Sequence, residues 1–307
     1  MLGLKRWWIY QRERFPVLKH GLLVAVFSSA AVSHSALLRQ AQPQPASLLV
    51  ACAVIFCSFL QLRIADEFKD YAEDCRYRPY RPLPRGLIRR WELAGLGVLT
   101  LVLQLLLSLS LGVQLAIALS LVWLYLAAMS LEFGVPAWLK AHLAVYMLSH
   151  LAIVPLIAFY GMACDWLVAG DARPSGSLWF LLASAASGAV IEFGRKIRAP
   201  AAEEPGVETY SARWGRGRAV AVWMGALMLA AIAALGAASQ IRALLLVAPL
   251  VILLVSIAGC LAWRFWQHPD RSPAGILETL AAIWTLTVYL SLGPLPVLLR
   301  AGFLGGF

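Results

Sequence analysis

The stretch RIADEFKDYAEDCRYRPYRPLPRG, Arg63 to Gly86, places five carboxylates within nine residues directly after an apolar run. Four arginines and four prolines or glycines follow the carboxylates. The rest of the chain has little charge, since 61% of its 307 residues are hydrophobic and only 14% are charged. In a typical soluble domain, roughly a quarter of the residues are charged. Such a concentration of charge in this chain indicates a specific role for the stretch.

Uncharged runs recur on both sides of this stretch, and most approach the ~20 residues that a helix needs to cross a bilayer core. The runs are Gly21–Leu38, Ala46–Leu62, Leu93–Leu131, Ala141–Cys164, Pro174–Ile191, Ala219–Ile241, Ala243–Trp263 and Thr279–Leu299. The Leu93–Leu131 run is about twice the length of one span, and Gly112 offers a break within it. We therefore predict an all-α, multi-pass membrane protein, a bundle of nine transmembrane helices that forms one domain over residues 1–307. The composition disfavours a large soluble core.

The net charge of +10 follows the predicted topology. With nine spans and a cytoplasmic N-terminus, all but four of the 26 lysines and arginines fall in cytoplasmic segments; the four are Arg39, Arg173, Arg242 and Arg300. The positive-inside rule explains this asymmetry, so we expect no nucleic-acid partner. The expected location is a bacterial inner membrane. Residues 1–16, MLGLKRWWIYQRERFP, are expected to form an interfacial segment with Trp7 and Trp8 at headgroup depth.

The acids of the opening stretch follow a helical period. Asp66, Asp70 and Asp74 are spaced i, i+4, i+8, which places them on one face of a helix that extends the second span, with Glu67 beside the first. Like charges at this spacing oppose helix formation, and the cost of unpaired acids rises near a membrane. We expect a cation to meet this face. Either the chain's own arginines on a solvated face or a divalent metal would serve.

A magnesium ion accounts for the pattern more specifically than the chain's own arginines do, because it takes oxygen ligands and usually bridges one or two carboxylates to phosphates. Pro79, Pro82 and Pro84 end the helix. The loop that follows would bring its arginines, Arg78, Arg81 and Arg85, over the acidic face. Basic residues of this kind bind phosphate oxygens. A diphosphate fits both halves of the stretch.

DEFKDYAEDCRYRPYRPLPRG resembles the first Asp-rich motif of the UbiA superfamily of intramembrane prenyltransferases, commonly written NDxxDxxxD followed by RPxRPxPxG. Asp66 takes the place of the Asn and Glu67 that of the first Asp, while Asp70 and Asp74 match the remaining acids. The segment from Arg78 to Gly86 matches the trailing motif. The resemblance extends over nearly the whole chain.

A second charged loop, EFGRKIRAPAAEEPGVETYSARWGRGR, Glu192 to Arg218, follows the sixth span as the first loop follows the second. It departs from the family's DxxxD pattern, and its charges also fit a solvated loop. The resemblance implies Glu192 as the favoured metal-side carboxylate, with Glu203 and Glu204 as further candidates. It implies that the diphosphate is held by basic residues of both loops and of the N-terminal segment, namely Arg14, Arg78, Arg81, Arg85, Arg195, Lys196 and Arg198.

The resemblance implies a function for these residues. An isoprenyl diphosphate would enter from the bilayer, and Mg²⁺ would hold its head in a cavity on the cytoplasmic side between the two loops. Asp66, Asp70 and Glu192 would be catalytic, with Glu67, Asp74, Glu203 and Glu204 as additional metal ligands. Glu192 is expected across a shared cavity from Asp66 and Asp70, within about 10 Å, because Mg²⁺–oxygen bonds must bridge through one diphosphate.

The fate of the prenyl group leaves two enzymatic alternatives. Transfer to a small acceptor would make the protein a prenyltransferase, and quenching within the same chain would make it a membrane terpene cyclase. Relatives that prenylate aromatic rings often have a Tyr followed by Lys-Arg on the fourth span, whereas here no Lys-Arg follows Tyr125. A transporter is disfavoured, because nearly all acids lie at the cytoplasmic ends of spans rather than within them. No obligate protein partner is expected.

The cysteines and histidines of the spans show no pattern of metal ligands. The five cysteines form no CxxC. His34 and His150 are expected to be hydrogen-bonded packing residues.

Overall fold

The computed structural model describes residues 2–203, 209–268 and 275–303. Within these ranges nine helical segments are long and apolar enough to cross a membrane, as the sequence predicts. They are α2 (Val17–Leu38), α3 (Pro45–Lys69), α5 (Arg90–Leu111), α6 (Val113–Ser130), α8 (Leu143–Leu151) with α9 (Ile153–Trp166), α10 (Ser177–Arg195), α12 (Arg216–Gln240), α13 (Leu244–Gln267), and α14 (Ile276–Leu292) with α15 (Pro294–Leu298) and η4 (Leu299–Phe303). The all-α prediction is confirmed.

Short helical elements connect or flank the spans. They are α1 (Leu2–Arg14), α4 (Tyr71–Tyr77), η1 (Glu132–Gly134), α7 (Pro136–Ala141), η2 (Pro200–Ala202) and α11 (Tyr210–Trp214). The predicted break at Gly112 separates α5 from α6, and its backbone has φ 152° and ψ 149°. Residues other than glycine rarely adopt this conformation. Gly112 therefore allows the long apolar run to form two spans.

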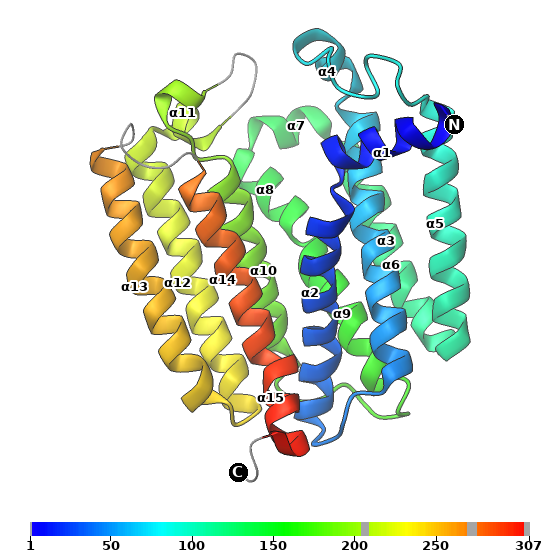
Figure 1. Ribbon diagram of the computed structural model, residues 1–307, viewed down its shortest axis with the longest axis vertical. Helices are drawn as coiled ribbons and strands as arrows, with labels where there is room; N and C mark the ends of the chain where they lie inside the picture. The colour runs from blue at the N-terminus through cyan, green and yellow to red at the C-terminus, as the bar shows by residue number, and fades with distance from the viewer. Residues whose placement is uncertain (1, 204–208, 269–274, 304–307) are drawn as a thin grey trace. The chain divides into compact units, whose positions relative to one another are not determined.

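The described residues form two compact units. The first, unit 1, takes Met1–Ser29 and Pro43–Asp171, and the second, unit 2, takes Ala30–Gln42 and Ala172–Phe307, so that α2 contributes to both. In unit 1, α3 and α6 each pack against α5 and α9. Figure 1 shows α1, α4 and α7 gathered at one end of these helices. The expectation of a single domain stays a prediction.

A buried network of glutamines joins the helices of unit 1. The Gln61 amide donates to Gln104 Oε1 at 2.7 Å and to the Thr100 hydroxyl at 3.1 Å. The Gln104 amide donates to the Val54 carbonyl and to Ser58, and Trp123 donates its indole N–H to Gln104 Oε1. Polar side chains that hydrogen-bond across helices stabilise bundles in a membrane, where apolar burial provides little driving force between helices.

Unit 2 is built on close contacts of α10. This helix packs against α12 and α14, and α12 packs against α13. A Cβ added to Gly194 would lie 2.9 Å from the Leu277 carbonyl oxygen, so glycine permits the approach of α10 to α14. His34, in the second half of α2, has Nδ1 2.8 Å from the Leu292 carbonyl and is fully buried. The prediction that His34 is a hydrogen-bonded packing residue is confirmed.

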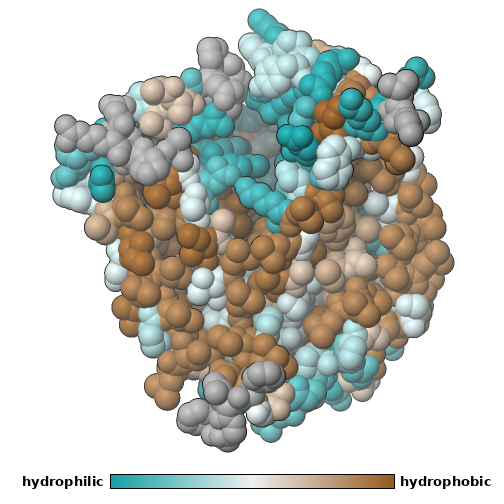
Figure 2. Space-filling model, viewed as in Figure 1, coloured by the Kyte–Doolittle hydropathy of each residue, from teal (hydrophilic) through white to brown (hydrophobic). Residues whose placement is uncertain are grey.

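Large apolar side chains cover the outer sides of several spans. On α5, Val98, Leu99 and Leu106 are each about 60% exposed. Figure 2 shows hydrophobic residues along the sides of the helices and hydrophilic residues toward their ends. Exposed apolar surface on helices of this length fits contact with lipid. The protein is an integral membrane protein with nine candidate spans among its described residues.

Candidate functional site

The predicted acidic row runs across the junction between α3 and α4. The helix α3 ends at Lys69, and Asp70 lies between the two helices with φ −86° and ψ 2°. The N–H of Asp70 donates to the Asp66 carbonyl at 2.9 Å, and the N–H of Asp74 donates to the Asp70 carbonyl at 2.8 Å. Helical hydrogen bonds thus continue from α3 into α4, although the backbone of Asp70 departs from helical geometry. The sequence predicted a single regular helix here. Along the row Asp66 is exposed, Asp70 half-buried and Asp74 buried.

Asp74 is neutralised by the arginines of the loop after α4. Arg81 Nη1 donates to both Asp74 carboxylate oxygens, at 2.7 and 2.6 Å, and Arg78 Nη1 lies 3.3 Å from one of them. The Asp74 side chain is 2% exposed. The loop therefore folds back over part of the acidic face. Arg85 turns elsewhere, since its guanidinium pairs with Glu13 of α1 at 2.9 Å.

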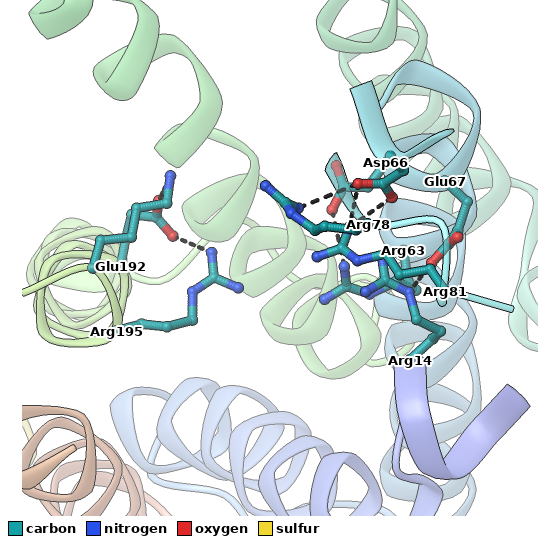
Figure 3. Close-up of polar contacts among 10 residues, drawn as sticks. Arg14, Arg63, Asp66, Glu67, Arg78, Arg81, Glu192 and Arg195 are labelled. Atoms are coloured by element: carbon teal, nitrogen blue, oxygen red, sulfur yellow. Dashed lines mark hydrogen bonds and ion pairs between the residues drawn. The ribbon is translucent and has the colours of Figure 1, made fainter. Parts of the chain in front are cut away.

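Glu67 is neutralised by Arg14, which reaches it from α1 (Figure 3). The Glu67 side chain is 1% exposed, and Arg14 Nε donates to its Oε1. Its other oxygen is buried and has no hydrogen-bond partner among the described residues. Burial raises the pKa of the nearby Tyr10 hydroxyl, and the negative charge of Glu67 raises this pKa further. The α1 helix is thereby fixed to the end of α3.

The two remaining acids of the row, Asp66 and Asp70, differ from each other in their surroundings. Asp66, whose side chain is 53% exposed, has Arg63 at 3.7 Å. Within the described ranges no hydrogen bond or ion pair reaches the Asp70 side chain. The pairing with the chain's own arginines, which the sequence left open as an explanation of the acidic face, therefore accounts for Glu67 and Asp74 but not for Asp70.

The N-terminal segment is more closely packed than expected for a wholly interfacial helix. Trp7 packs against a cluster of apolar residues that includes Tyr10, with 5.8 Å between the two ring centroids, whereas Trp8 is 61% exposed. The placement of this segment at the membrane interface stays a prediction.

In unit 2, Glu192 and Glu203 are also paired with nearby residues. Glu192, in the last turn of α10, pairs with Arg195 at 2.6 Å and with Lys196 at 2.7 Å, and Figure 3 shows the pair with Arg195. Its side chain is 24% exposed. Arg198 is fixed through its backbone N–H, which donates to the Ser211 hydroxyl at 2.9 Å.

Glu203 stabilises the start of α11. Its carboxylate accepts hydrogen bonds from the hydroxyls of Thr209 and Ser211, at 2.7 to 2.8 Å. Thr209 in turn caps α11 by accepting from the N–H of Ala212. These bonds engage Glu203 within its own loop. Glu204 lies outside the described residues.

The arrangement of the acids bears on the binding of magnesium. No group of three His, Cys, Asp or Glu residues that could hold a metal ion occurs in the described part of the chain. Mg²⁺ does not need such a cage, because it usually keeps waters and binds one or two carboxylates together with substrate phosphates. The unpaired carboxylate of Asp70, one turn after the exposed Asp66, fits this mode of binding.

Another polar group in unit 1 was not predicted from the sequence. Lys69 forms an ion pair with Glu132 and a hydrogen bond with Tyr146, and its Nζ lies 3.3 Å from His150 Nε2. One indication was present in the sequence, since Glu132 is the sole acid between Glu92 and Asp165. An isolated acid among apolar residues of a membrane protein indicates a functional position.

Comparisons with known proteins agree with this fold and with the motif. The model of the UbiA prenyltransferase family matches residues 22–286. The solved structure of a UbiA homologue from Aeropyrum pernix K1 has a TM-score of 0.67 at 12% identity and covers 90% of this chain and 98% of its own. A structure of digeranylgeranylglyceryl phosphate synthase has a TM-score of 0.60 at 15% identity and covers 98% and 99% of the two chains. No curated protein matches the sequence. Because the family model covers most of its length, the chain belongs to the UbiA prenyltransferase family.

Proposed function

We propose that this protein is a Mg²⁺-dependent intramembrane prenyltransferase that ionises an isoprenyl diphosphate and transfers the prenyl group to an acceptor. Membership of the UbiA family supports the reaction class. The observation that carries the proposal is the environment of Asp70. Its carboxylate is unpaired among the described residues, between two buried acids, Glu67 and Asp74, that arginines neutralise. A half-buried carboxylate of this kind is ready to bind a cation.

The acids divide into two roles in this proposal. Asp66 and Asp70 would hold Mg²⁺ from the first loop and Glu192 from the second, with Glu203 and Glu204 as further candidates there. Glu67 and Asp74 keep arginines in place beside the metal ligands, through Arg14 and through Arg78 with Arg81. Bound Mg²⁺ stabilises the charge that develops on the departing diphosphate.

The basic residues of the two loops hold the phosphate oxygens. In the first loop these are Arg78 and Arg81, together with Arg14 from α1, whereas Arg85 would first have to release Glu13. In the second loop they are Arg195, Lys196 and Arg198. Guanidinium groups suit this task, because they donate two parallel hydrogen bonds to a phosphate. Arg195 and Lys196 pair with Glu192, and they would be able to bind phosphate oxygens if Glu192 bound the metal instead.

The proposal includes the orientation of the protein and one shared site. Both loops follow an even-numbered candidate span, so they would emerge on the same side of the membrane if every candidate crosses it. The excess of basic residues on that side supports a cytoplasmic location. We propose one site shared by both loops, with its cavity on this side, from the matching positions of the loops in the chain alone.

The test uses purified protein in detergent with Mg²⁺ and a panel of isoprenyl diphosphates of different lengths, with release of diphosphate as the readout. Asp70→Asn is expected to lower the rate of release by roughly 10²- to 10³-fold, the effect typical for loss of one group that stabilises developing charge. Glu73→Gln is the matched control, because Glu73 is an exposed acid one turn further along. Its rate is expected to equal that of the wild type. A rate for Asp70→Asn close to that of the wild type would contradict the proposal.

The products separate the two enzymatic alternatives. A prenylated acceptor identifies a prenyltransferase. Cyclic hydrocarbons that form in the same amount with and without an acceptor identify a membrane terpene cyclase instead. The lack of Lys-Arg after Tyr125 is the reason for considering this alternative.

A further inference from the structure

A polar cluster lies in unit 1 where α3 ends, and it takes no part in the diphosphate site proposed above. The Lys69 cluster consists of Lys69, Glu132, Tyr146 and His150. Lys69 Nζ lies 2.9 Å from Glu132 Oε1, 2.7 Å from the Tyr146 hydroxyl and 3.3 Å from His150 Nε2. The Tyr146 ring stacks on the His150 ring with 4.1 Å between centroids. Three chain segments, α3, η1 and α8, thus converge on one ammonium group.

The hydrogen bonds of His150 define its protonation state. His150 Nδ1 lies 2.8 Å from the Tyr146 carbonyl oxygen, which can only accept a hydrogen bond. Nδ1 therefore carries a proton, and in the neutral ring Nε2 presents its lone pair to Lys69. The three donors of the Lys69 ammonium are all used, by a carboxylate, a phenol and an imidazole.

Two atoms of the cluster have hydrogen-bonding capacity that the described residues do not fill. Glu132 is 6% exposed, and its Oε2 is buried with no hydrogen-bond partner there. The Tyr146 hydroxyl accepts from Lys69, but no acceptor for its own proton occurs among the described residues. A buried acceptor without a partner costs about 1–3 kcal/mol. One unfilled acceptor and one unfilled donor therefore belong to the same cluster.

The turn that places Glu132 is strained. Glu132 has φ 48° and Phe133 has φ 53°, so two consecutive residues with side chains adopt left-handed conformations. Each such residue costs on the order of 1–3 kcal/mol, and this kind of strain gathers at ligand sites. The strained turn and the unfilled carboxylate oxygen are independent observations, and both indicate a ligand.

The charges of the cluster restrict that ligand. The ammonium of Lys69 and the carboxylate of Glu132 balance each other, so a further anion would be buried without a counter-charge at high cost. A neutral hydroxyl fits, because it can donate to Glu132 Oε2 and accept from the Tyr146 hydroxyl. The partly exposed side of the cluster is formed by Tyr146 and His150. The Glu132 carboxylate can turn toward that side about its broad terminal torsion.

We propose that the Lys69 cluster binds the hydroxyl group of the prenyl acceptor, which is an alcohol or a phenol, and that Glu132 accepts its proton. This inference rests on the proposed function. In the transfer the acceptor oxygen forms a bond to the allylic carbon of the prenyl group, and the bond from that carbon to the diphosphate oxygen breaks. The electron pair of the broken bond leaves with the diphosphate, and the hydroxyl proton passes to Glu132 Oε2. Lys69 directly precedes Asp70, so the cluster adjoins the carboxylate proposed to hold Mg²⁺.

The test offers four probes in place of the acceptor, 1-decanol, 4-nonylphenol, decanoate and decyl phosphate, together with Mg²⁺ and the isoprenyl diphosphate that the protein turns over. The readout is the share of released prenyl groups that end on the probe rather than on water. We expect coupling to at least one hydroxyl probe and none to decanoate or to the phosphate of decyl phosphate. Glu132→Gln is expected to lower the coupled share at least tenfold, and Tyr146→Phe to raise the KM for the probe several-fold.

Glu92→Gln is the matched control, because Glu92 is also an ion-paired acid of unit 1, with Arg6 as its partner, and lies outside the cluster. Its coupled share is expected to match that of the wild type. Tyr146→Phe keeps the Lys69–Glu132 ion pair and so serves if Glu132→Gln does not fold. Coupling to neither hydroxyl probe, equal coupling to decanoate, or an unchanged share in the variants would overturn the inference. Failure of the proposed function would give a different result from failure of this inference. In that case the wild type would show no Mg²⁺-dependent release of diphosphate.

Discussion

At the scale of single residues, the Arg14–Glu67 ion pair removes two charges from water where α1 meets α3. The side chains are 11% and 1% exposed. Removing one partner of a buried pair leaves an uncompensated charge, which typically costs about 3–5 kcal/mol. The Arg85–Glu13 pair joins the same α1 to the same loop region but is exposed by 36% and 40%. Exposed pairs contribute about 0–1 kcal/mol.

We therefore expect Arg14→Met to lower the free energy of unfolding by about 3–5 kcal/mol, and Arg85→Met to lower it by less than about 1 kcal/mol. Adding Glu67→Gln to Arg14→Met should recover part of the loss, because it removes the unpaired charge. Denaturation of the purified protein in detergent measures all three values. Equal losses for Arg14→Met and Arg85→Met would contradict this account of Glu67.

The sequence predicted the acids of the first loop as a group but not their individual environments. The spacing of Asp66, Asp70 and Asp74 is local, so it can be recognised in the chain. Which acid pairs with an arginine depends on contacts between distant segments, such as that of Arg14 with Glu67 across 53 positions. The Lys69 cluster was missed for the same reason, because its members come from three separate segments.

At the scale of elements, Gln104 connects α5 with α3 and α6 through buried hydrogen bonds. Its side chain contacts the Val54 carbonyl, Ser58, Gln61 and Trp123. Hydrogen bonds between membrane helices each contribute roughly 0.6 kcal/mol and at most about 1.7 kcal/mol. The spans could be predicted from hydropathy along the chain, and the break at Gly112 from the length of the Leu93–Leu131 run and the glycine within it. This network could not, because it depends on which helices become neighbours.

Gln104→Leu is expected to lower the free energy of unfolding by about 1–3 kcal/mol, since several such bonds are lost together. Gln114→Leu is the control, because Gln114 is exposed on α6. Its effect should lie within about 0.5 kcal/mol of zero. Denaturation in detergent provides the comparison, and a loss for Gln104→Leu no larger than that for Gln114→Leu would show that the network does not stabilise the bundle.

At the scale of the whole molecule, the central claim is that one diphosphate is held by both charged loops with Mg²⁺. Family membership supports the reaction class, and the matching positions of the two loops after the second and sixth spans support a shared site. The second loop departs from the family pattern, so the sequence could predict Glu192 as a ligand only from its place in the chain.

The most direct test is calorimetric titration of the purified protein with an isoprenyl thiolodiphosphate, an analogue that binds without reacting. The account predicts that binding requires Mg²⁺ and weakens at least tenfold in Asp70→Asn and in Glu192→Gln, while Glu73→Gln binds like the wild type. Binding of equal strength in excess chelator, or binding by Glu192→Gln as tight as that of the wild type, would contradict a magnesium-bridged site shared by the two loops.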